Sequence, residues 1–287
     1  MNRARHGHPV VPDPAVQELL QPGQSIALLQ ELHILTRDGK LNQDSRRKLK
    51  QVSHLIQLLE PSIRALQVQH PDGVDLVDHG AGKSYLGFLL YDLIWRHQSG
   101  GTIWGVEARE ALVQRCVELA RQLGFARMRF LATQVADAGV DEGIPREVAM
   151  VTALHACDSA TDDAIAFALQ RKAQCIALVP CCHAEMARVL TANKALALAR
   201  TPLAELWRHP LHTREFGAQV TNVARCLYLQ AQGYQVRVTE LVGWEHSLKN
   251  ELILAQYTGQ RSRAARQRLD ALVAELGLES WAELHLQ

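Results

Sequence analysis

The chain has 287 residues, of which 47% are hydrophobic and 21% charged, a composition that excludes wholesale disorder and predicts a substantial core. Lys and Arg (31) nearly balance Asp and Glu (30), so the net charge of +1 excludes a global basic field, while a local basic face stays open. No apolar run approaches the roughly 20 residues of a membrane span, and the first residues lack the apolar core of a secretory signal.

The first part of the chain predicts helices. Ser25 is placed to cap a short helix that ends near Leu35, and residues 36–39 form a turn. A second helix starts near Asp44, and Pro61 predicts a break or a new helix start. The outer face of this helix carries the cations Arg46, Arg47, Lys48 and Lys50. They form either a solvated charged face or a contact for phosphates.

From residue 74 onward, short apolar strands alternate with helices. The expected strands are 74–77, 102–106, 128–131, 148–154, 175–179, 236–242 and 252–257. The expected helices are 83–97, 111–123, 162–172, 184–200 and 218–232. This alternation predicts a mostly parallel sheet with helices on both faces. The last two strands leave no room for a helix between them, so the last strand should be antiparallel.

The expected organisation is therefore an α/β fold with a seven-stranded sheet and an N-terminal helical extension. The predicted divisions are an N-terminal arm and helical extension at 1–68, the α/β domain at 69–258 and a C-terminal helical tail at 259–287.

The strongest local signal is the segment Asp78-His79-Gly80-Ala81-Gly82 after the first strand. A phosphate-binding P-loop needs a glycine where Val77 stands, and the dinucleotide fingerprint needs one where Tyr85 stands, so both interpretations are weakened. An acidic residue two positions before Gly-x-Gly instead resembles the first motif of class I S-adenosylmethionine (SAM)-dependent methyltransferases. The resemblance implies a Rossmann-like methyltransferase sheet and SAM as the cofactor.

The cofactor contacts follow from that motif. Glycines let the backbone pass close to the methionine part of SAM, and Asp78 can orient its ammonium group. Glu107, at the end of the second strand, can accept hydrogen bonds from the ribose hydroxyls. Gln134 and Val135, after the third strand, are predicted beside the adenine. The complete predicted cofactor set is Asp78, Gly80, Gly82, Lys83, Tyr85, Glu107, Gln134 and Val135.

Cysteine and histidine side chains follow the fourth and fifth strands, in His155-Ala156-Cys157-Asp158 and Pro180-Cys181-Cys182-His183. Neighbouring strands of a parallel sheet bring such ends together. They can shape the acceptor pocket with His155 or His183 as a base, or supply Cys181 or Cys182 as a covalent nucleophile. Zinc binding and plain packing are the other interpretations, and no metal is favoured. The cysteines lie in apolar segments, which predicts reduced thiols and a cytoplasmic protein.

A narrower resemblance rests on three segments: residues 78–86, His155-Ala156-Cys157 with Ala160-Thr161-Asp162, and Pro180-Cys181-Cys182-His183. They are similar to a methyltransferase branch that includes a eukaryotic tRNA acceptor-stem 2′-O-methyltransferase, although Asp158 replaces a glycine of that pattern. The resemblance implies an RNA acceptor, with tRNA as one candidate. Thr161-Asp162 is also the expected cap of the helix that follows. The predicted catalytic residues are His155, Asp162, Cys181, Cys182 and His183, and the predicted RNA contacts are Arg46, Arg47, Lys48, Lys50 and Lys249.

Two alternatives stay open at the level of function. The acceptor can be a protein or a small molecule, or the chain can be a non-catalytic SAM-binding scaffold associated with RNA. The Asn/Asp-Pro-Pro motif of many amino-group methyltransferases does not follow the fourth strand, which disfavours adenine N6 as the acceptor atom.

Overall fold

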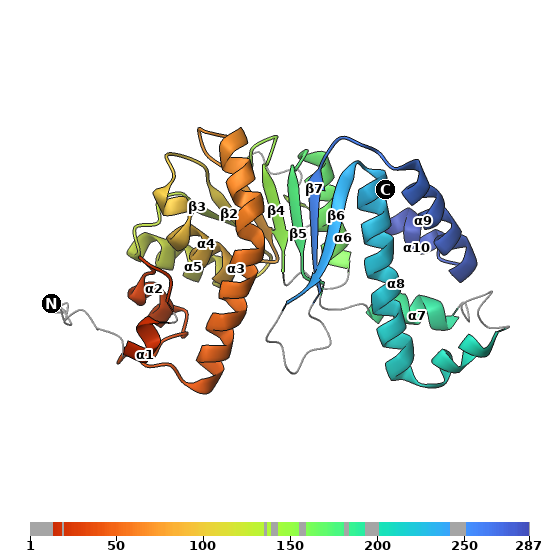
Figure 1. Ribbon diagram of the computed structural model, residues 1–287, viewed down its shortest axis with the longest axis horizontal. Coiled ribbons are helices and arrows are strands. Elements are labelled where there is room, and N and C mark those ends of the chain that lie inside the picture. Colours follow the sequence, from red (N-terminus) through yellow and green to blue (C-terminus); the bar gives the residue numbers. More distant parts are fainter. Residues whose placement is uncertain are drawn as a thin grey trace.

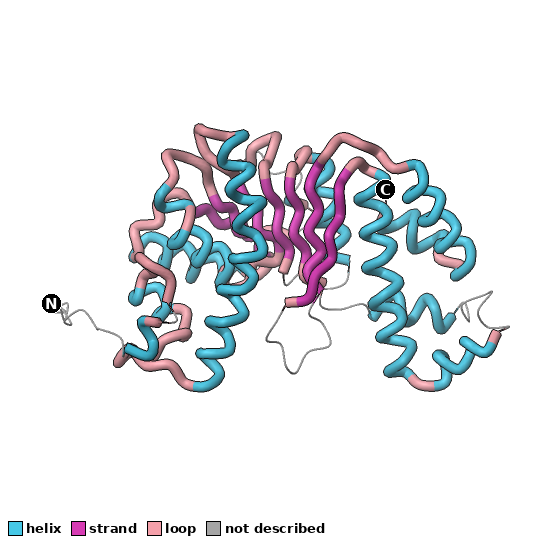
Figure 2. The backbone as a smooth tube through the Cα atoms, in the orientation of Figure 1, coloured by secondary structure: helices cyan, strands magenta, loops and turns pink. Residues whose placement is uncertain are grey.

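The computed structural model describes residues 14–18, 20–134, 137–138, 143–154, 159–180, 184–192, 201–241 and 251–286. These residues build a seven-stranded sheet with helices on both faces (Figure 1, Figure 2), which confirms the predicted fold class. The strands are β1 (Leu76–His79), β2 (Ile103–Glu107), β3 (Met128–Ala132), β4 (Met150–Ala153), β5 (Cys175–Leu178), β6 (Tyr234–Glu240) and β7 (Glu251–Tyr257).

The strand order is β3-β2-β1-β4-β5-β7-β6, so β1 lies between β2 and β4 in the interior of the sheet. The pairs β1–β2, β1–β4, β2–β3 and β4–β5 are parallel. β7 runs antiparallel to both of its neighbours, β5 and β6, as expected for the last strand. The carboxyl ends of β1, β4 and β5 therefore lie at one edge of the sheet, where the ligands of parallel sheets collect.

Alternate strand residues face two separate cores, because successive side chains point to opposite sides of a strand. Leu76 and Met150 belong to the core that also holds α2 to α5, while Val77 and Val151 belong to the core under α6 to α10. The helices are α1 (Pro14–Gln17), α2 (Ile26–Glu31), α3 (Gln43–Gln69), α4 (Tyr85–Leu93), α5 (Glu110–Gln122), α6 (Ser159–Gln170), α7 (Ala184–Ala192), α8 (Pro210–Ala231), α9 (Arg263–Leu276) and α10 (Glu279–His285), with the 3₁₀ turns η1 (Trp95–His97) and η4 (Pro202–Arg208). No described helix combines the length and the apolar character that crossing a bilayer requires.

Several expected helix boundaries are wrong. α2 ends at Glu31 and not near Leu35, and α8 begins at Pro210 and not at 218. α3 runs without interruption through Pro61, because its inner face is buried on both sides of the proline while Pro61 itself faces solvent. The buried Leu59 and Ile63 hold the two halves of the helix against one core. α6 begins at Ser159, so Thr161 and Asp162 lie inside its first turn and do not cap the helix.

The N-terminal helices are fastened to the sheet domain by a buried carboxylate. Asp92 of α4 is fully buried, and its Oδ2 accepts a hydrogen bond from the Ser25 backbone N–H at 2.7 Å. Ser25 in turn caps α2, as predicted, since its Oγ accepts from the Leu28 backbone N–H. Arg96 donates to the other oxygen of Asp92 at 2.6 Å. The start of α2 is thus held by a hydrogen bond to an ionisable group.

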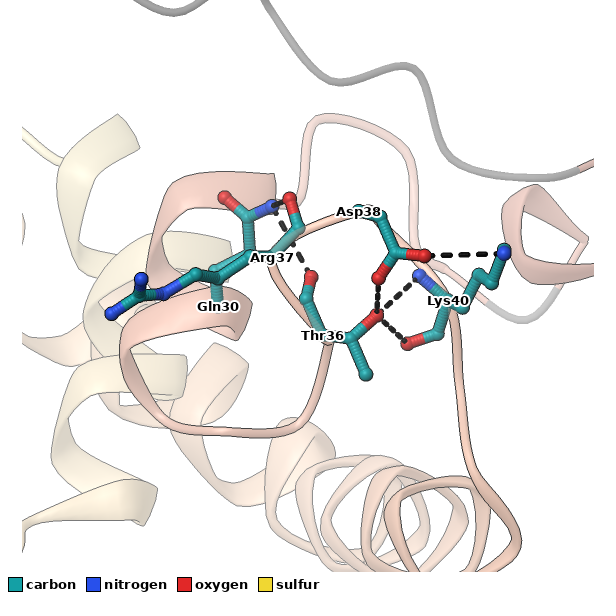
Figure 3. Close-up of polar contacts among 5 residues, drawn as sticks. All are labelled: Gln30, Thr36, Arg37, Asp38 and Lys40. Atoms are coloured by element: carbon teal, nitrogen blue, oxygen red, sulfur yellow. Dashed lines mark hydrogen bonds and ion pairs between the residues drawn. The ribbon is translucent and has the colours of Figure 1, made fainter. Parts of the chain in front are cut away.

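The turn between α2 and α3 is closed by several hydrogen bonds (Figure 3). Thr36 Oγ1 donates to Asp38 Oδ1 at 2.6 Å and accepts from the Lys40 backbone N–H at 2.9 Å. The Gln30 side-chain amide donates to the backbone carbonyls of Thr36 and Arg37. This network confirms the predicted turn and fixes the direction in which the chain enters α3.

Figure 1 shows that the N-terminal half of α3 extends past the ends of the strands, on the side of the sheet where β6 ends. β6 runs parallel to β5, because both are antiparallel to β7. The first half of α3 therefore extends beyond the carboxyl edge at which β1, β4 and β5 end.

Candidate active site

The glycine loop after β1 has a backbone conformation that glycine adopts most readily. Gly80 and Gly82 have φ angles of 63° and 58°. A Cβ added at Gly82 would find no heavy atom closer than 3.9 Å outside its chain neighbours, so the space beside this residue is open. The loop can therefore accept the close passage of a ligand, which is the property that the sequence motif predicts.

Asp78 lies in β1, two residues before the first loop glycine, and is 3% exposed. Its Oδ1 accepts a hydrogen bond from Thr152 Oγ1 of β4 at 2.6 Å. Burial raises the pKa of Asp78 to about 7, and the Thr152 hydrogen bond opposes that rise. A cationic group placed next to Asp78 would favour the ionised carboxylate, so this position suits an ammonium group.

Glu107 contacts the loop from the end of β2. Its Oε2 accepts from the Gly82 backbone N–H at 2.9 Å, and its Oε1 accepts from Arg109 Nε at 2.8 Å and from the Arg109 backbone N–H at 3.0 Å. These bonds, led by the Arg109 side chain, lower the pKa of Glu107. The Arg109 side chain is 69% exposed, so a ligand can displace it from the carboxylate at small cost.

A cavity of about 280 Å³ opens beside the glycine loop, and we call it the loop cavity. Asp78, Gly80, Ala81, Tyr85 and Leu86 supply part of its lining. The rest comes from residues that the sequence did not indicate, namely Ile34, Gln51, Val52, Leu55, Leu154, Val179 and Leu241. The N-terminal segment thus completes the loop cavity, and the lining is predominantly apolar.

The other predicted cofactor residues are distributed around the loop. Lys83 is exposed and lines a second cavity, whereas Tyr85, the first residue of α4, lines both cavities. Gln134 is exposed after β3, and Val135 lies outside the described residues.

Asp162, predicted among the catalytic residues, takes part in a buried ion pair. It is 4% exposed, and Arg225 of α8 donates to its two oxygens from Nε at 2.6 Å and from Nη2 at 2.8 Å. His285 of α10 places Nδ1 at 3.7 Å from Asp162 and Nε2 at 3.0 Å from Glu185 of α7. Asp162 lines neither of the two cavities. We infer that it holds α6 to α8 and α10, and its catalytic role stays a prediction.

The remaining predicted catalytic residues, His155, Cys181, Cys182 and His183, lie outside the described residues, as do Cys157 and Lys249. The strand ends that lead into them are adjacent, since β4 and β5 pair in parallel. The described residues Leu154 and Val179, at these two ends, both line the loop cavity.

Several site residues were missed for identifiable reasons. Thr152 is the polar residue of an otherwise apolar buried strand, and that signal could have indicated a partner for Asp78. Ile34, Val52 and Leu55 have the sequence pattern of ordinary core positions, because no local pattern separates a cavity wall from a core.

Comparison with known proteins adds to this site. A family model described as a methyltransferase domain matches residues 47–189, a span that includes most of α3, the glycine loop and both strand ends. The chain belongs to the class I SAM-dependent methyltransferase superfamily, and it is an enzyme that uses SAM. The open glycine loop and the two carboxylates beside it fit this cofactor. No curated protein sequence matches the chain.

Solved structures resemble the chain at the level of the fold. An rRNA methylase from Streptococcus thermophilus shares 11% identity with a TM-score of 0.40, over 65% of this chain and 87% of the other. The magnesium protoporphyrin IX methyltransferase ChlM from Synechocystis PCC 6803, with bound S-adenosylhomocysteine (SAH), shares 14% identity with a TM-score of 0.44, over 82% and 95%. TrmK from M. capricolum, in complex with SAH, shares 8% identity with a TM-score of 0.42, over 69% and 68%.

Proposed function

We propose that this methyltransferase acts on RNA, with the tRNA branch that its strand-end segments resemble as the substrate class to test first. The observation that carries the proposal is the position of the α3 cations. Arg46 and Lys50 are exposed and Arg47 is half-buried, and their side chains form no ion pair with the described part of the chain. Their position beside the candidate active site favours a phosphate contact over a solvated charged face.

These cations directly precede the cavity wall. Gln51, Val52 and Leu55, in the next turns of α3, line the loop cavity. Arg47 lies four residues before Gln51, so the two positions share one face of the helix. A polyanion held by the first turns of α3 would therefore reach the cavity beside the glycine loop. The Lys48 side chain and Lys249 lie outside the described residues and stay predictions as RNA contacts.

The proposed cofactor contacts follow the geometry of the loop. Asp78 would orient the ammonium group, and Gly80 and Gly82 leave room for the methionine chain. Glu107 would accept hydrogen bonds from the ribose hydroxyls once the exposed Arg109 side chain has moved away. Tyr85, Gln134 and Val135 remain proposed contacts at the rim.

SAM supplies an already activated methyl group, so the chain mainly has to align an acceptor atom with it. The apolar wall of α3 excludes water from the loop cavity and positions the acceptor group. We assign removal of an acceptor proton, where one is needed, to His155 or His183, and we assign Cys181 and Cys182 to packing around the acceptor. We place the protein in the cytoplasm, where cysteines such as the unpaired Cys116, Cys175 and Cys226 stay reduced.

The test combines methyl transfer with RNA binding. Transfer of labelled methyl from SAM is measured into RNA, protein and small-molecule fractions of a cell extract. In parallel, RNA affinity is measured against salt for the Arg46→Ala, Arg47→Ala, Lys50→Ala triple variant. Each lost phosphate contact should flatten the slope of log affinity against log salt by about 0.7 to 0.9.

The matched control removes three cations elsewhere, through Arg261→Ala, Arg263→Ala and Arg268→Ala at and before α9. We expect label in RNA, a flattened slope in the α3 variant and the wild-type slope in the control. Label confined to protein or to small molecules would assign the enzyme to that acceptor class instead. Binding of SAM and RNA with no transfer to any fraction would indicate a non-catalytic scaffold.

A further inference from the structure

A second cavity, of about 560 Å³, lies on the other side of Tyr85, and we call it the outer cavity. It is formed by the end of α2, by the residues after the glycine loop and by one face of α5. Its lining consists of Glu31, Leu32, His33, Lys83, Tyr85, Ala111, Leu112, Gln114, Arg115, Cys116, Glu118, Leu119 and Gln122. Of the predicted cofactor residues, Lys83 and Tyr85 belong to this lining.

At the end of α2 two consecutive residues, His33 and Ile34, line different cavities because of the local backbone conformation. His33 has a φ of 54°, and its N–H bonds the Gln30 carbonyl while the Ile34 N–H bonds the Leu29 carbonyl. This pair of hydrogen bonds is a Schellman motif, with His33 in the left-handed position that usually holds glycine. Ile34 is then buried and lines the loop cavity, whereas the exposed His33 lines the outer cavity.

The charges of the outer cavity favour an anion. Lys83 and Arg115 are exposed, and their side chains form no ion pair with the described residues. The carboxylate of Glu118 is already paired with Arg121, at 2.8 and 2.9 Å. Glu31 is the remaining acid of the lining, so the lysine and the arginine outnumber it, and His33 adds a further nitrogen donor.

We propose that the outer cavity binds a backbone phosphate of the RNA acceptor, held between Lys83 and Arg115. Tyr85 lines both cavities, and the segment from Glu31 to Ile34 borders both, so the phosphate belongs to a nucleotide adjoining the one that is methylated. We assign Lys83 to this substrate contact because it lines the outer cavity together with Arg115. This inference rests on the proposed function, because it requires an RNA acceptor.

The experiment measures binding of a fluorescein-labelled, mixed-sequence single-stranded RNA by anisotropy across a salt series, with SAH present throughout. The test variant is Lys83→Gln with Arg115→Gln, and a charge-conserving variant is Lys83→Arg with Arg115→Lys. The control is Arg263→Gln with Arg268→Gln, which removes the same charge from α9, on the opposite face of the sheet. Thermal unfolding of each variant verifies that the fold is retained.

Loss of this one phosphate contact should flatten the slope of log affinity against log salt by about 0.7 in the test variant. The charge-conserving variant and the α9 control should keep the wild-type slope. A test variant with the same slope as the α9 control overturns the phosphate site while leaving the proposed function in place. Absence of salt-dependent RNA binding in the wild-type chain overturns both.

Discussion

The carboxylates beside the glycine loop and the carboxylate of α6 have contrasting partners. Asp78 has a single neutral hydroxyl, Thr152 Oγ1, as its hydrogen-bond partner among the described residues. Glu107 is held by two backbone amides and by the side chain of a surface arginine. Asp162 is closed off by the two nitrogen donors of the fully buried Arg225. A carboxylate with replaceable partners is available to a ligand, whereas one inside a buried ion pair holds helices together.

The two regions also differ in what surrounds them. Asp78 lines the loop cavity, and Glu107 accepts a hydrogen bond from the glycine loop that borders it. Asp162 is enclosed by α6, α8 and α10, and His285 links it to Glu185 of α7. The helices α6 and α7 begin just after the two Cys/His segments. The buried cluster therefore holds the helices that follow those segments in the sequence.

The largest expected effect is on the buried ion pair. Asp162→Ala leaves the Arg225 guanidinium buried without its carboxylate, which should lower the free energy of unfolding by about 3–5 kcal/mol. Urea unfolding measures this, and SAH affinity of the folded protein should stay near wild type. The matched change Glu185→Gln, at a side chain that is 29% exposed, should cost far less. A stable Asp162→Ala protein that binds SAH but transfers no methyl group would contradict the structural role and show that Asp162 is needed for catalysis.

The second effect concerns Glu107. Glu107→Gln keeps the shape of the side chain but removes the charged acceptor, so the free energy of SAH binding should weaken by about 1–3 kcal/mol, or roughly 5- to 150-fold in affinity. Because Arg109 is mostly exposed, the same change should leave the unfolding free energy nearly unaltered. Calorimetric titration with SAH tests the first statement and urea unfolding the second. A variant that loses stability while it keeps its SAH affinity would make Glu107 a structural carboxylate like Asp162.

The smallest expected effect per pH unit is on the free energy of unfolding. It comes from His79 and Asp78, two buried neighbours in β1 whose pKa values shift in opposite directions on folding. Burial lowers the pKa of His79 from 6.5 to about 3, so the unfolded chain binds the extra proton and stability falls as the pH drops through this range. Burial raises the pKa of Asp78 from 3.8 to about 7, so the folded chain binds the extra proton and stability falls as the pH rises through that range. Between about pH 4 and 6.5 the two slopes, each about 1.4 kcal/mol per pH unit, should nearly cancel.

Single substitutions separate the two slopes in the protein without cofactor. Relative to wild type, His79→Leu should lose stability as the pH rises from about 4 to 7, because only Asp78 then contributes. Asp78→Asn should gain stability over about pH 3 to 6.5, because only His79 contributes. Urea unfolding at each pH gives both profiles. Two profiles parallel to that of the wild type would show that the pKa of neither group shifts on folding.

Local sequence patterns were sufficient for the framework of this protein. Alternating apolar strands and helices predicted the sheet, because burial on both faces imposes a composition that each short segment shows by itself. The Ser25 cap and the turn at 36–39 depend on hydrogen bonds between residues a few positions apart, so they too can be predicted from neighbours. The positions of the glycine loop after β1 and of Glu107 at the end of β2 could be predicted for the same reason, since they lie within one strand–helix turn and the next strand end.

Tertiary structure decided what each side chain does once the chain is folded. Pro61 stays inside α3 because packing along the whole helix outweighs one missing backbone hydrogen bond. Asp162 became part of a buried cluster because Arg225 and His285, far along the chain, meet it across helices. Ile34, Val52 and Leu55 line the loop cavity although they precede the glycine loop by more than 20 residues in the sequence. Such contacts join residues that are remote in sequence, so no local pattern of the chain can specify them.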